Sequence, residues 1–298
     1  MISIVTGPTS GIGAETALGL ARLGGTVVLV ARNRARGARF ASSVERAGAA
    51  AAHVVVAYLS SQEQIAGAAD AIARAVPQVD VLVNNAGAYF ARRQTSRDGI
   101  EMNLALNHLA YFSLTLRLMG ALRRSAAARI VNVSSEAHWS ATIDLDDLQS
   151  ERGYDRLRAY ARSKLANVLF TYELARRLEG TSVTVNAVHP GAVATNLGAN
   201  NGWLKVRVRN LVHRLSSPAE GARTSLYVAT APALRGVSGK YFSDCREHRT
   251  SDASYDRDAA ARLWDVSEEL TGLRWREVSG APDAACTPAP SALGHPAT

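Results

Sequence analysis

The chain has 298 residues, of which 47% are hydrophobic and 20% are charged, a balance that supplies a sizeable core and excludes general disorder. The formal net charge of +8 comes from scattered arginines, with no long basic block and no nucleic-acid-binding motif, so we expect no nucleic-acid partner. Two cysteines are too few for a disulfide framework, the histidines lack metal-ligand spacing, and no apolar run reaches the roughly 18 residues of a membrane helix.

The first predicted unit is a short strand, a glycine-rich turn and a helix. The apolar strand Ile2–Val5 runs into Thr6-Gly-Pro-Thr-Ser-Gly-Ile-Gly13, and helical character follows over 14–23. The first glycine permits a tight turn, the second lets the backbone approach a pyrophosphate, and the third allows close packing of strand and helix. A phosphate would bind the free N–H groups at the helix N-terminus. The alternative is a glycine turn without a ligand. The candidate cofactor-binding residues of this unit are Gly7, Thr9, Ser10, Gly11, Ile12 and Gly13.

The second predicted strand, Thr26–Ala31, is followed by an arginine at the place that selects between the two nicotinamide cofactors. An acidic residue there holds the 2′-hydroxyl of the adenine ribose, whereas arginine accommodates a 2′-phosphate. No Asp or Glu occurs between Glu15 and Glu45, so we predict NADP(H), with Arg32 as the phosphate contact and Asn33 beside it. The alternative is that the arginines only solvate the start of a helix.

Strands and helices continue to alternate, a pattern typical of a parallel sheet covered on both faces. Further strands are predicted at 53–58, 79–83, 129–133, 181–188 and 237–242, and further helices at 35–47, 62–76, 100–124 and 158–179. The predicted fold class is α/β, a Rossmann-type doubly wound parallel sheet in a single domain over residues 1–276. The Pro- and Ala-rich residues 277–298 are expected to form a disordered tail.

Polar loops follow three of the predicted strands. Asn84-Asn-Ala-Gly87 follows the strand at 79–83, Ser134-Ser135 follows 129–133, and His189-Pro-Gly191 follows 181–188. In open sheets of this kind, ligands bind beyond the carboxyl ends of the strands. We therefore expect the three loops to converge with the glycine-rich turn on one site.

The strongest chemical signal is the pair Tyr160 and Lys164. The chain holds 31 arginines and only three lysines, yet one lysine stands four residues after a tyrosine, which places both side chains on one helix face. A cation beside a phenol favours the phenolate and lowers its pKa toward neutral pH. Such a phenol exchanges a proton with an alcohol or carbonyl oxygen. The alternative is a surface Tyr–Lys pair on an amphipathic helix.

Together these motifs resemble the short-chain dehydrogenase/reductase family over nearly the whole chain. Asn107 adds a further match, and Arg32 stands where the retinol dehydrogenase branch carries its NADP-selecting arginine. One departure is Tyr58, because the family usually places an aspartate there against the adenine. Longer stretches similar to that branch are 99–102, 106–109, 129–135, 163–170 and 238–245.

The resemblance implies a role for each matched residue. Ser135 polarises the substrate oxygen, Tyr160 is the acid in reduction and the base in oxidation, and Lys164 lowers the pKa of Tyr160 and binds the nicotinamide ribose. Asn107 orders a water that extends the proton relay from Lys164, and Thr195 bonds the carboxamide. The remaining cofactor-lining residues that it implies are Leu59, Asn84, Asn85, Ala86, Gly87, Pro190, Gly191 and Val193.

The substrate is expected to lie under a lid at about residues 196–217, where apolar and basic residues are mixed, with the inserted segment 139–156 as the other wall. The apolar side chains favour a hydrophobic or polycyclic carbonyl or alcohol, whereas the arginines would favour an anionic or polyoxygenated one. The alternative for 196–217 is an amphipathic helix packed on the body. The predicted activity is NADP(H)-dependent interconversion of a carbonyl and an alcohol, with reduction as the expected direction.

Two other functions fit the same motifs. The site could use its hydride transiently, for epimerisation or dehydration, or the chain could bind NADP as a sensor without turnover. The intact Ser135, Tyr160 and Lys164 argue against a sensor, which needs no proton relay. By analogy with the family we expect a homodimer or homotetramer paired through its long helices. We also expect a cytoplasmic location, no membrane anchor and no bound metal.

Overall fold

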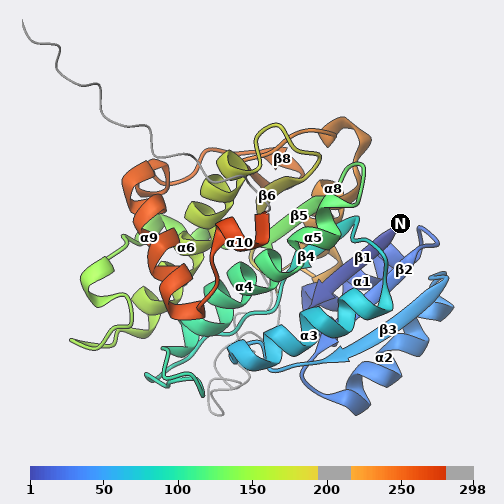
Figure 1. The fold of residues 1–298 in the computed structure, drawn as a ribbon, viewed down its shortest axis with the longest axis horizontal. Coiled ribbons are helices and arrows are strands. Elements are labelled where there is room, and N and C mark those ends of the chain that lie inside the picture. The colour runs from blue at the N-terminus through green and yellow to red at the C-terminus, as the bar shows by residue number, and fades with distance from the viewer. Residues whose placement is uncertain (194–215, 280–298) are drawn as a thin grey trace, which may run out of the picture.

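A computed structural model describes residues 1–193 and 216–279, whose strands form one eight-stranded sheet in the order β3-β2-β1-β4-β5-β6-β7-β8 (Figure 1). The first seven strands are parallel, and β8 pairs antiparallel with β7. The chain builds outward from β1 to β3 and then crosses back to β4, so the doubly wound α/β prediction is confirmed. The strands are β1 (Ile2–Thr6), β2 (Thr26–Ala31), β3 (Ala51–Val56), β4 (Val81–Asn84), β5 (Arg129–Val133), β6 (Thr184–His189), β7 (Lys240–Ser243) and β8 (Arg246–Glu247).

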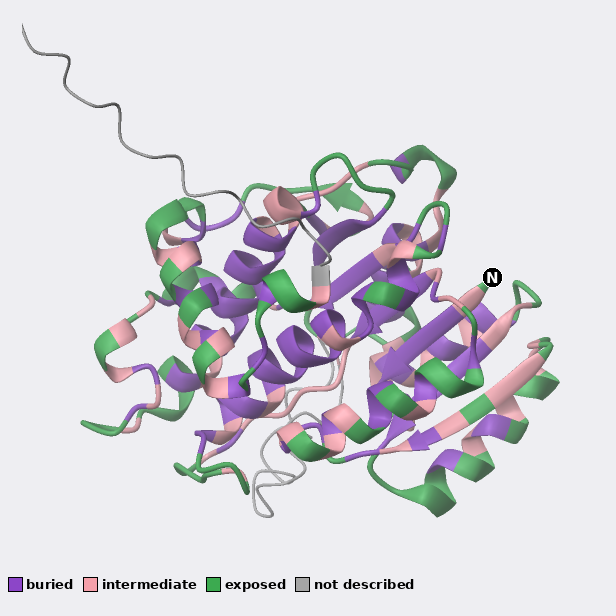
Figure 2. Ribbon diagram, viewed as in Figure 1, coloured by how far each residue is buried: buried purple, intermediate pink, exposed green. Residues whose placement is uncertain are grey.

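Helices cover both faces of the sheet, because side chains alternate along each buried strand. In β2, Val27 and Leu29 join the apolar cluster of one face, and Val28 and Val30 join that of the other. The inner strands of the sheet are buried along most of their length (Figure 2). The first face carries α1 (Gly11–Ala21), α2 (Arg34–Arg46) and α8 (Pro218–Thr230); the second carries α3 (Gln62–Ala75), α4 (Ala110–Arg117) and α6 (Arg156–Arg177).

Two C-terminal helices, α9 (Arg257–Thr271) and α10 (Trp275–Ser279), add a second layer outside α4 and α6 (Figure 1). The Trp264 ring lies 5.0 Å from that of Phe112 and 5.9 Å from that of Phe170, measured between centroids, and Trp275 packs edge-on against Trp264 at 5.7 Å. The expected pairing of copies through the long helices stays a prediction. A partner approaching α4 and α6 from this side would first meet α9 and α10.

The predicted helix at 100–124 is divided in the structure. A π-helical turn, η1 (Leu104–Leu109), precedes α4, and a break at Leu118 (φ −91°, ψ 1°) separates α4 from α5 (Met119–Arg123). The α10 helix runs to Ser279, three residues beyond the expected domain boundary at 276. Short 3₁₀ turns are η2 (Glu136–Ser140), η3 (Leu145–Asp147), η6 (Pro232–Leu234) and η7 (Asp252–Tyr255).

Candidate active site

The β1–α1 turn has the backbone geometry that its glycines predict. Gly7 (φ +64°) and Gly11 (φ +59°) lie in the left-handed region that favours glycine. A Cβ on Gly13 would lie 2.4 Å from both the Asn85 Nδ2 and the Gly7 carbonyl oxygen, so no larger residue fits. Ser10, the N-cap of α1, makes no side-chain cap hydrogen bond, and the first helical turn holds no acidic residue. This cradle of free N–H groups therefore suits a phosphate.

The loop after β4 braces this turn. Thr6 Oγ1 accepts hydrogen bonds from the backbone N–H groups of Asn85 (2.8 Å) and Ala86 (2.9 Å), and Asn85 Nδ2 donates to the Thr6 carbonyl (2.8 Å). The predicted residues Asn85, Ala86 and Gly87 thus lie beside the glycine turn.

Asn84 differs from its neighbour, contrary to the expectation that it lines the cofactor. Its side chain is fully buried, and its Nδ2 donates to Thr115 Oγ1 (3.0 Å) and to Asn132 Oδ1 (2.9 Å). Asn132 in turn donates to Thr171 Oγ1 (3.0 Å). Asn84 therefore belongs to a polar network in the core, where it joins β4 to β5 and α4.

The residues predicted for the adenosine end lie at the carboxyl ends of β2 and β3. Arg32 is exposed directly after β2, where a phosphate can reach it. Asn33 is the N-cap of α2, and its Oδ1 accepts from the Arg36 N–H (2.9 Å). The Leu59 side chain is buried in the core, so only its backbone is left for the predicted cofactor contact. Tyr58, at the position of the missing aspartate, is exposed.

The predicted catalytic residues meet at the carboxyl end of β5. Ser135 follows β5, and its Oγ accepts from the Ala137 N–H (3.2 Å). The Ser135 hydroxyl lies close enough to the Tyr160 hydroxyl to lower the pKa of that phenol. Lys164 lies one turn further along α6, where its Nζ donates to the Val133 carbonyl (3.0 Å) and sits 5.8 Å from the Tyr160 ring centroid. The sequence spacing thus brings these three side chains together.

The pKa of Tyr160 shifts in the opposite direction from the expected one. Burial raises the pKa of Tyr160 to about 12, against the opposing effect of the nearby Ser135 side chain. Burial also lowers the pKa of Lys164 to about 7, because a desolvated ammonium group is disfavoured. The phenol is therefore protonated at neutral pH, as an unshifted phenol is, and the raised pKa makes it a weaker acid.

Asn107 lies in the π-helical turn, a distortion that is frequent at functional sites. Its Nδ2 donates to the Ala88 carbonyl (2.9 Å) and to Ser163 Oγ (3.0 Å), and its Oδ1 accepts from the Ala88 N–H (2.9 Å). A Cβ on Gly87 would lie 3.1 Å from Asn107 Oδ1 and 3.6 Å from Lys164 Nζ. The glycine thus leaves room beside Lys164.

The loop after β6 closes the site beside α1. Pro190 and Gly191 (φ +81°) follow β6. A Cβ on Gly221 of α8 would lie 2.6 Å from Val193 Cγ2 and 3.1 Å from Ile12 Cγ1, so this glycine lets the loop reach the first turn of α1. The predicted carboxamide contact Thr195 lies outside the described residues, as does the expected lid except for its last two positions, 216 and 217.

Two residues beside the site were not predicted. The Tyr89 ring packs edge-on against Tyr160, with centroids 5.9 Å apart and an interplanar angle of 70°. The buried His138 bonds through Nδ1 to the Ser135 carbonyl (2.7 Å), and its Nε2 accepts from the Ser251 N–H (3.3 Å). Burial lowers the pKa of His138, which favours the neutral ring that this arrangement requires. Their nearness in sequence to Gly87 and Ser135 was the available signal.

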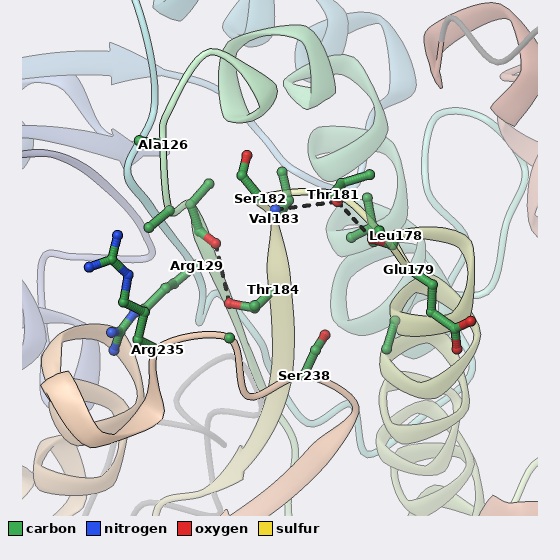
Figure 3. A pocket seen from close by; sticks show the side chains of 15 residues that line it. Ala126, Arg129, Leu178, Glu179, Thr181, Ser182, Val183, Thr184, Arg235 and Ser238 are labelled. Atoms are coloured by element: carbon green, nitrogen blue, oxygen red, sulfur yellow. Dashed lines mark hydrogen bonds between the residues drawn. The ribbon is translucent and has the colours of Figure 1, made fainter.

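A cavity of about 360 Å³ lies at the opposite edge of the sheet, around the amino ends of β5 and β6 (Figure 3). Its lining includes Arg129, Thr184, Arg235 and Ser238 and none of the predicted site residues. The Thr184 hydroxyl donates to the Ala128 carbonyl (3.2 Å), and Arg129 Nη1 donates to the Ala231 carbonyl (2.8 Å). These polar side chains therefore hydrogen-bond to backbone groups. A search by cavity volume alone would select this edge of the sheet and not the edge that carries the predicted site residues.

Within the described ranges, no group of His, Cys, Asp and Glu side chains is arranged to hold a metal ion. The same ranges contain no helix with both the length and the apolar character needed to cross a membrane.

Comparisons with known proteins agree with this geometry. The family model of the short chain dehydrogenases matches residues 1–202. Human retinol dehydrogenase 14 is 41% identical over 289 residues, which cover 91% of this chain and 86% of that protein. A solved structure described as a putative uncharacterized protein from Mycobacterium paratuberculosis is 33% identical, with a TM-score of 0.75, and covers 92% of this chain and 94% of that one. The Pseudomonas aeruginosa RhlG/NADP active-site complex is 27% identical, with a TM-score of 0.65, covering 81% and 93%.

Proposed function

The chain belongs to the retinol dehydrogenase-like branch of the short-chain dehydrogenase/reductase family, and we propose that it uses NADPH to reduce a hydrophobic carbonyl compound to an alcohol. The observation that carries this proposal is the meeting of Ser135, Tyr160 and Lys164 around one point at the carboxyl end of β5.

The proton chemistry falls to Ser135 and Tyr160. The two hydroxyl groups lie close enough for Ser135 to act on the pKa of Tyr160, so a carbonyl oxygen placed between them would accept from both. With a pKa of about 12, Tyr160 arrives protonated and gives its proton to the oxygen as negative charge develops there. The bound cofactor supplies the hydride.

Lys164 and Asn107 would restore the proton. Lys164 is buried between the Val133 carbonyl and the Tyr160 ring. With a pKa of about 7, it can hold or release a proton near neutral pH. The side-chain amide of Asn107 is fully engaged with Ala88 and Ser163. We therefore assign the relay contact of Asn107 to its backbone carbonyl.

NADP rather than NAD is favoured by the end of β2. Arg32 is exposed there, and no carboxylate occurs between Glu15 and Glu45 to take the 2′-hydroxyl of NAD. The glycine turn at the start of α1 provides the N–H groups for the pyrophosphate. The solved NADP complex of RhlG supports the same cofactor for this chain.

A hydrophobic substrate is favoured by the side chains next to the catalytic ones. Trp139, four residues after Ser135, is 54% exposed, and Leu157, one turn before Tyr160, is 64% exposed. Large apolar side chains on a surface commonly mark a binding region. The relative named retinol dehydrogenase 14 supports a substrate of apolar character.

The test is NADPH oxidation, followed by absorbance, with a panel of hydrophobic aldehydes and polycyclic ketones. We expect turnover by the native protein and its loss in Tyr160→Phe. Tight NADPH binding without any turnover would contradict the proposal and favour a sensor. Conversion of a substrate without net NADPH consumption would favour the transient-hydride reaction instead.

The assembly and location complete the proposal. We propose a homodimer or homotetramer in the cytoplasm, acting on a freely diffusing substrate. Light scattering after size-exclusion chromatography measures the oligomeric state. Fractionation of the producing cells measures the location, and recovery of the protein in the membrane fraction would contradict the proposed cytoplasmic location.

A further inference from the structure

The loop that follows β4 is fixed at two points on either side of Tyr89. On one side, Asn107 makes a reciprocal pair of hydrogen bonds with the Ala88 backbone, both 2.9 Å long. On the other side, the Tyr154 hydroxyl donates to the Phe90 carbonyl (2.7 Å). Tyr89 is therefore the one residue between two anchored neighbours, and its backbone has little freedom to move.

The second anchor is itself held by buried groups. Asn103 Nδ2 donates to the Tyr154 hydroxyl (2.9 Å) and to Glu101 Oε1 (2.8 Å). Glu101 is buried, and its carboxylate also accepts from the backbone N–H groups of Asn103 and Leu104, both at 2.9 Å. Tyr154 comes from the inserted segment 139–156, so this network ties the insertion to the loop that carries Tyr89.

The side chain of Tyr89 lies between the proton donor and the start of α6. Its ring stands edge-on to Tyr160 at 5.9 Å, and the charges of Arg156 and Asp155 both act on its hydroxyl. The residue is only partly buried. A substrate carbonyl bonded to Tyr160 would place its nearest substituent within reach of this ring.

We infer that Tyr89 is a specificity-determining residue that favours carbonyl compounds bearing a planar, unsaturated or aromatic group next to the reacting carbon. Asn107 and Tyr154 are its positioning residues. An aromatic ring pairs with another through its quadrupole in an edge-on or offset arrangement, which a saturated ring of similar size cannot do. Because the loop that carries Tyr89 is held in advance on both sides, little of this preference is lost to ordering the loop. The inference rests on the proposed reductase function.

The test compares benzaldehyde with cyclohexanecarbaldehyde, which are similar in size. The kcat/KM ratio of the two substrates is measured for the native protein, Tyr89→Leu and the matched control Tyr89→Phe. Dividing each variant's ratio by the native ratio cancels the different intrinsic reactivities of the two aldehydes. We expect Tyr89→Leu to lower the ratio roughly two- to tenfold and Tyr89→Phe to keep it within about twofold.

Tyr154→Phe tests the positioning. We expect it to lower the same ratio by part of the Tyr89→Leu effect and to speed amide hydrogen exchange at Tyr89 and Phe90. A purely structural role for Tyr154 would reduce stability and leave the ratio unchanged, which would overturn its assignment. An unchanged ratio in Tyr89→Leu would overturn the whole inference.

If the native protein reduces neither these aldehydes nor the earlier panel, the proposed function fails. Binding then decides the inference separately. Saturation-transfer NMR compares benzyl alcohol with cyclohexylmethanol on the NADP-loaded protein. A preference for benzyl alcohol that Tyr89→Leu removes supports the inference, and equal binding of the two alcohols by the native protein overturns it.

Discussion

The two halves of the sheet present their functional groups in different ways. The nucleotide half, β1 to β3, offers backbone N–H groups of a glycine turn and exposed side chains such as Arg32 and Asn33. The catalytic half, β4 to β7, holds its groups inside, with Asn107, His108 and Lys164 almost completely buried. Burial lowers the pKa of His108 and Lys164 in the catalytic half. Substitutions in the first half should therefore change which nucleotide binds, and those in the second should change proton chemistry and pH dependence.

The largest expected effect is in the catalytic half. Tyr160→Phe removes the proton donor and should lower kcat by about 10²- to 10⁴-fold, since general acid catalysis is worth that much. The Kd for NADPH should change little. The matched control is Tyr172→Phe on the same helix, whose hydroxyl bonds to Thr250 Oγ1 (2.8 Å) away from the site. Equal losses in both variants would show that the phenol acts through the fold and not through chemistry.

The next effect is a loss of stability in acid caused by His108. This ring is fully buried against Phe170, with its Nε2 bonded to Ser267 Oγ (2.9 Å), and burial lowers its pKa to about 4. Between pH 6.5 and 4 the unfolded chain binds a proton at this histidine and the folded chain does not. The free energy of unfolding should therefore fall as the pH drops through this window, by on the order of 3 kcal/mol from this residue.

Denaturant unfolding at pH 7 and pH 4 measures this fall in the free energy of unfolding. In His108→Gln the part of this fall that comes from His108 should be absent, even if the variant is less stable at both pH values. The control is His53→Gln at an exposed position of the nucleotide half, which should keep the full acid dependence. The same dependence in His108→Gln as in the native chain would assign the acid loss to other groups.

A smaller effect is expected in the nucleotide half, where a substitution should change the preference between NADPH and NADH. Arg32→Asp replaces the proposed 2′-phosphate contact with a carboxylate that suits a free 2′-hydroxyl. We expect the ratio of kcat/KM for NADPH to that for NADH to fall about 10- to 100-fold, in line with a charged hydrogen bond. Arg39→Asp on α2 makes the same change in net charge at another exposed position. A similar fall in both variants would indicate a general charge effect and not a contact at Arg32.

The smallest expected effect concerns Asn33. Its side-chain oxygen already caps α2, so Asn33→Ala should lower the free energy of unfolding by about 1 kcal/mol. The KM for NADPH should stay within about twofold if the cap is the main role, and Asn33→Ser should restore most of the stability. A large rise in KM in both variants would instead support the predicted cofactor contact.

The fold was predictable because its signals are local. Each inner strand is a short apolar run next to a turn, and the loops at the carboxyl ends follow once the strands are parallel. Helices α8 and α9 were not predicted. The start of α8 could have been recognised, because Ser217 and Glu220 form a capping box and Pro218 occupies the first turn. The π-helical turn at Leu104–Leu109 depends on bonds to distant loops, which a local pattern does not contain.

The sequence predicted most residues of the candidate site, but it did not predict the burial of Asn84 or the pKa shift of Tyr160. Asn84 and Asn85 are neighbours with the same side chain, and the pleat sends them to opposite sides. Asn84 shares the side of Leu82, which packs in the cluster of the α4 face, so counting along the strand could have placed it in the core. The raised pKa of Tyr160 was not predictable in this way, since it follows from burial created by the whole fold.

The tryptophans of α9 and α10 also set an order of events during synthesis. Phe112 and Phe170 belong to helices that leave the ribosome long before Trp264 and Trp275, which then cover them. The aromatic cluster beneath α9 stays open until residues beyond 257 have emerged. A nascent chain therefore carries an exposed apolar surface between the synthesis of Phe170 and that of Trp264, and that interval is when chaperones and misfolding compete for it.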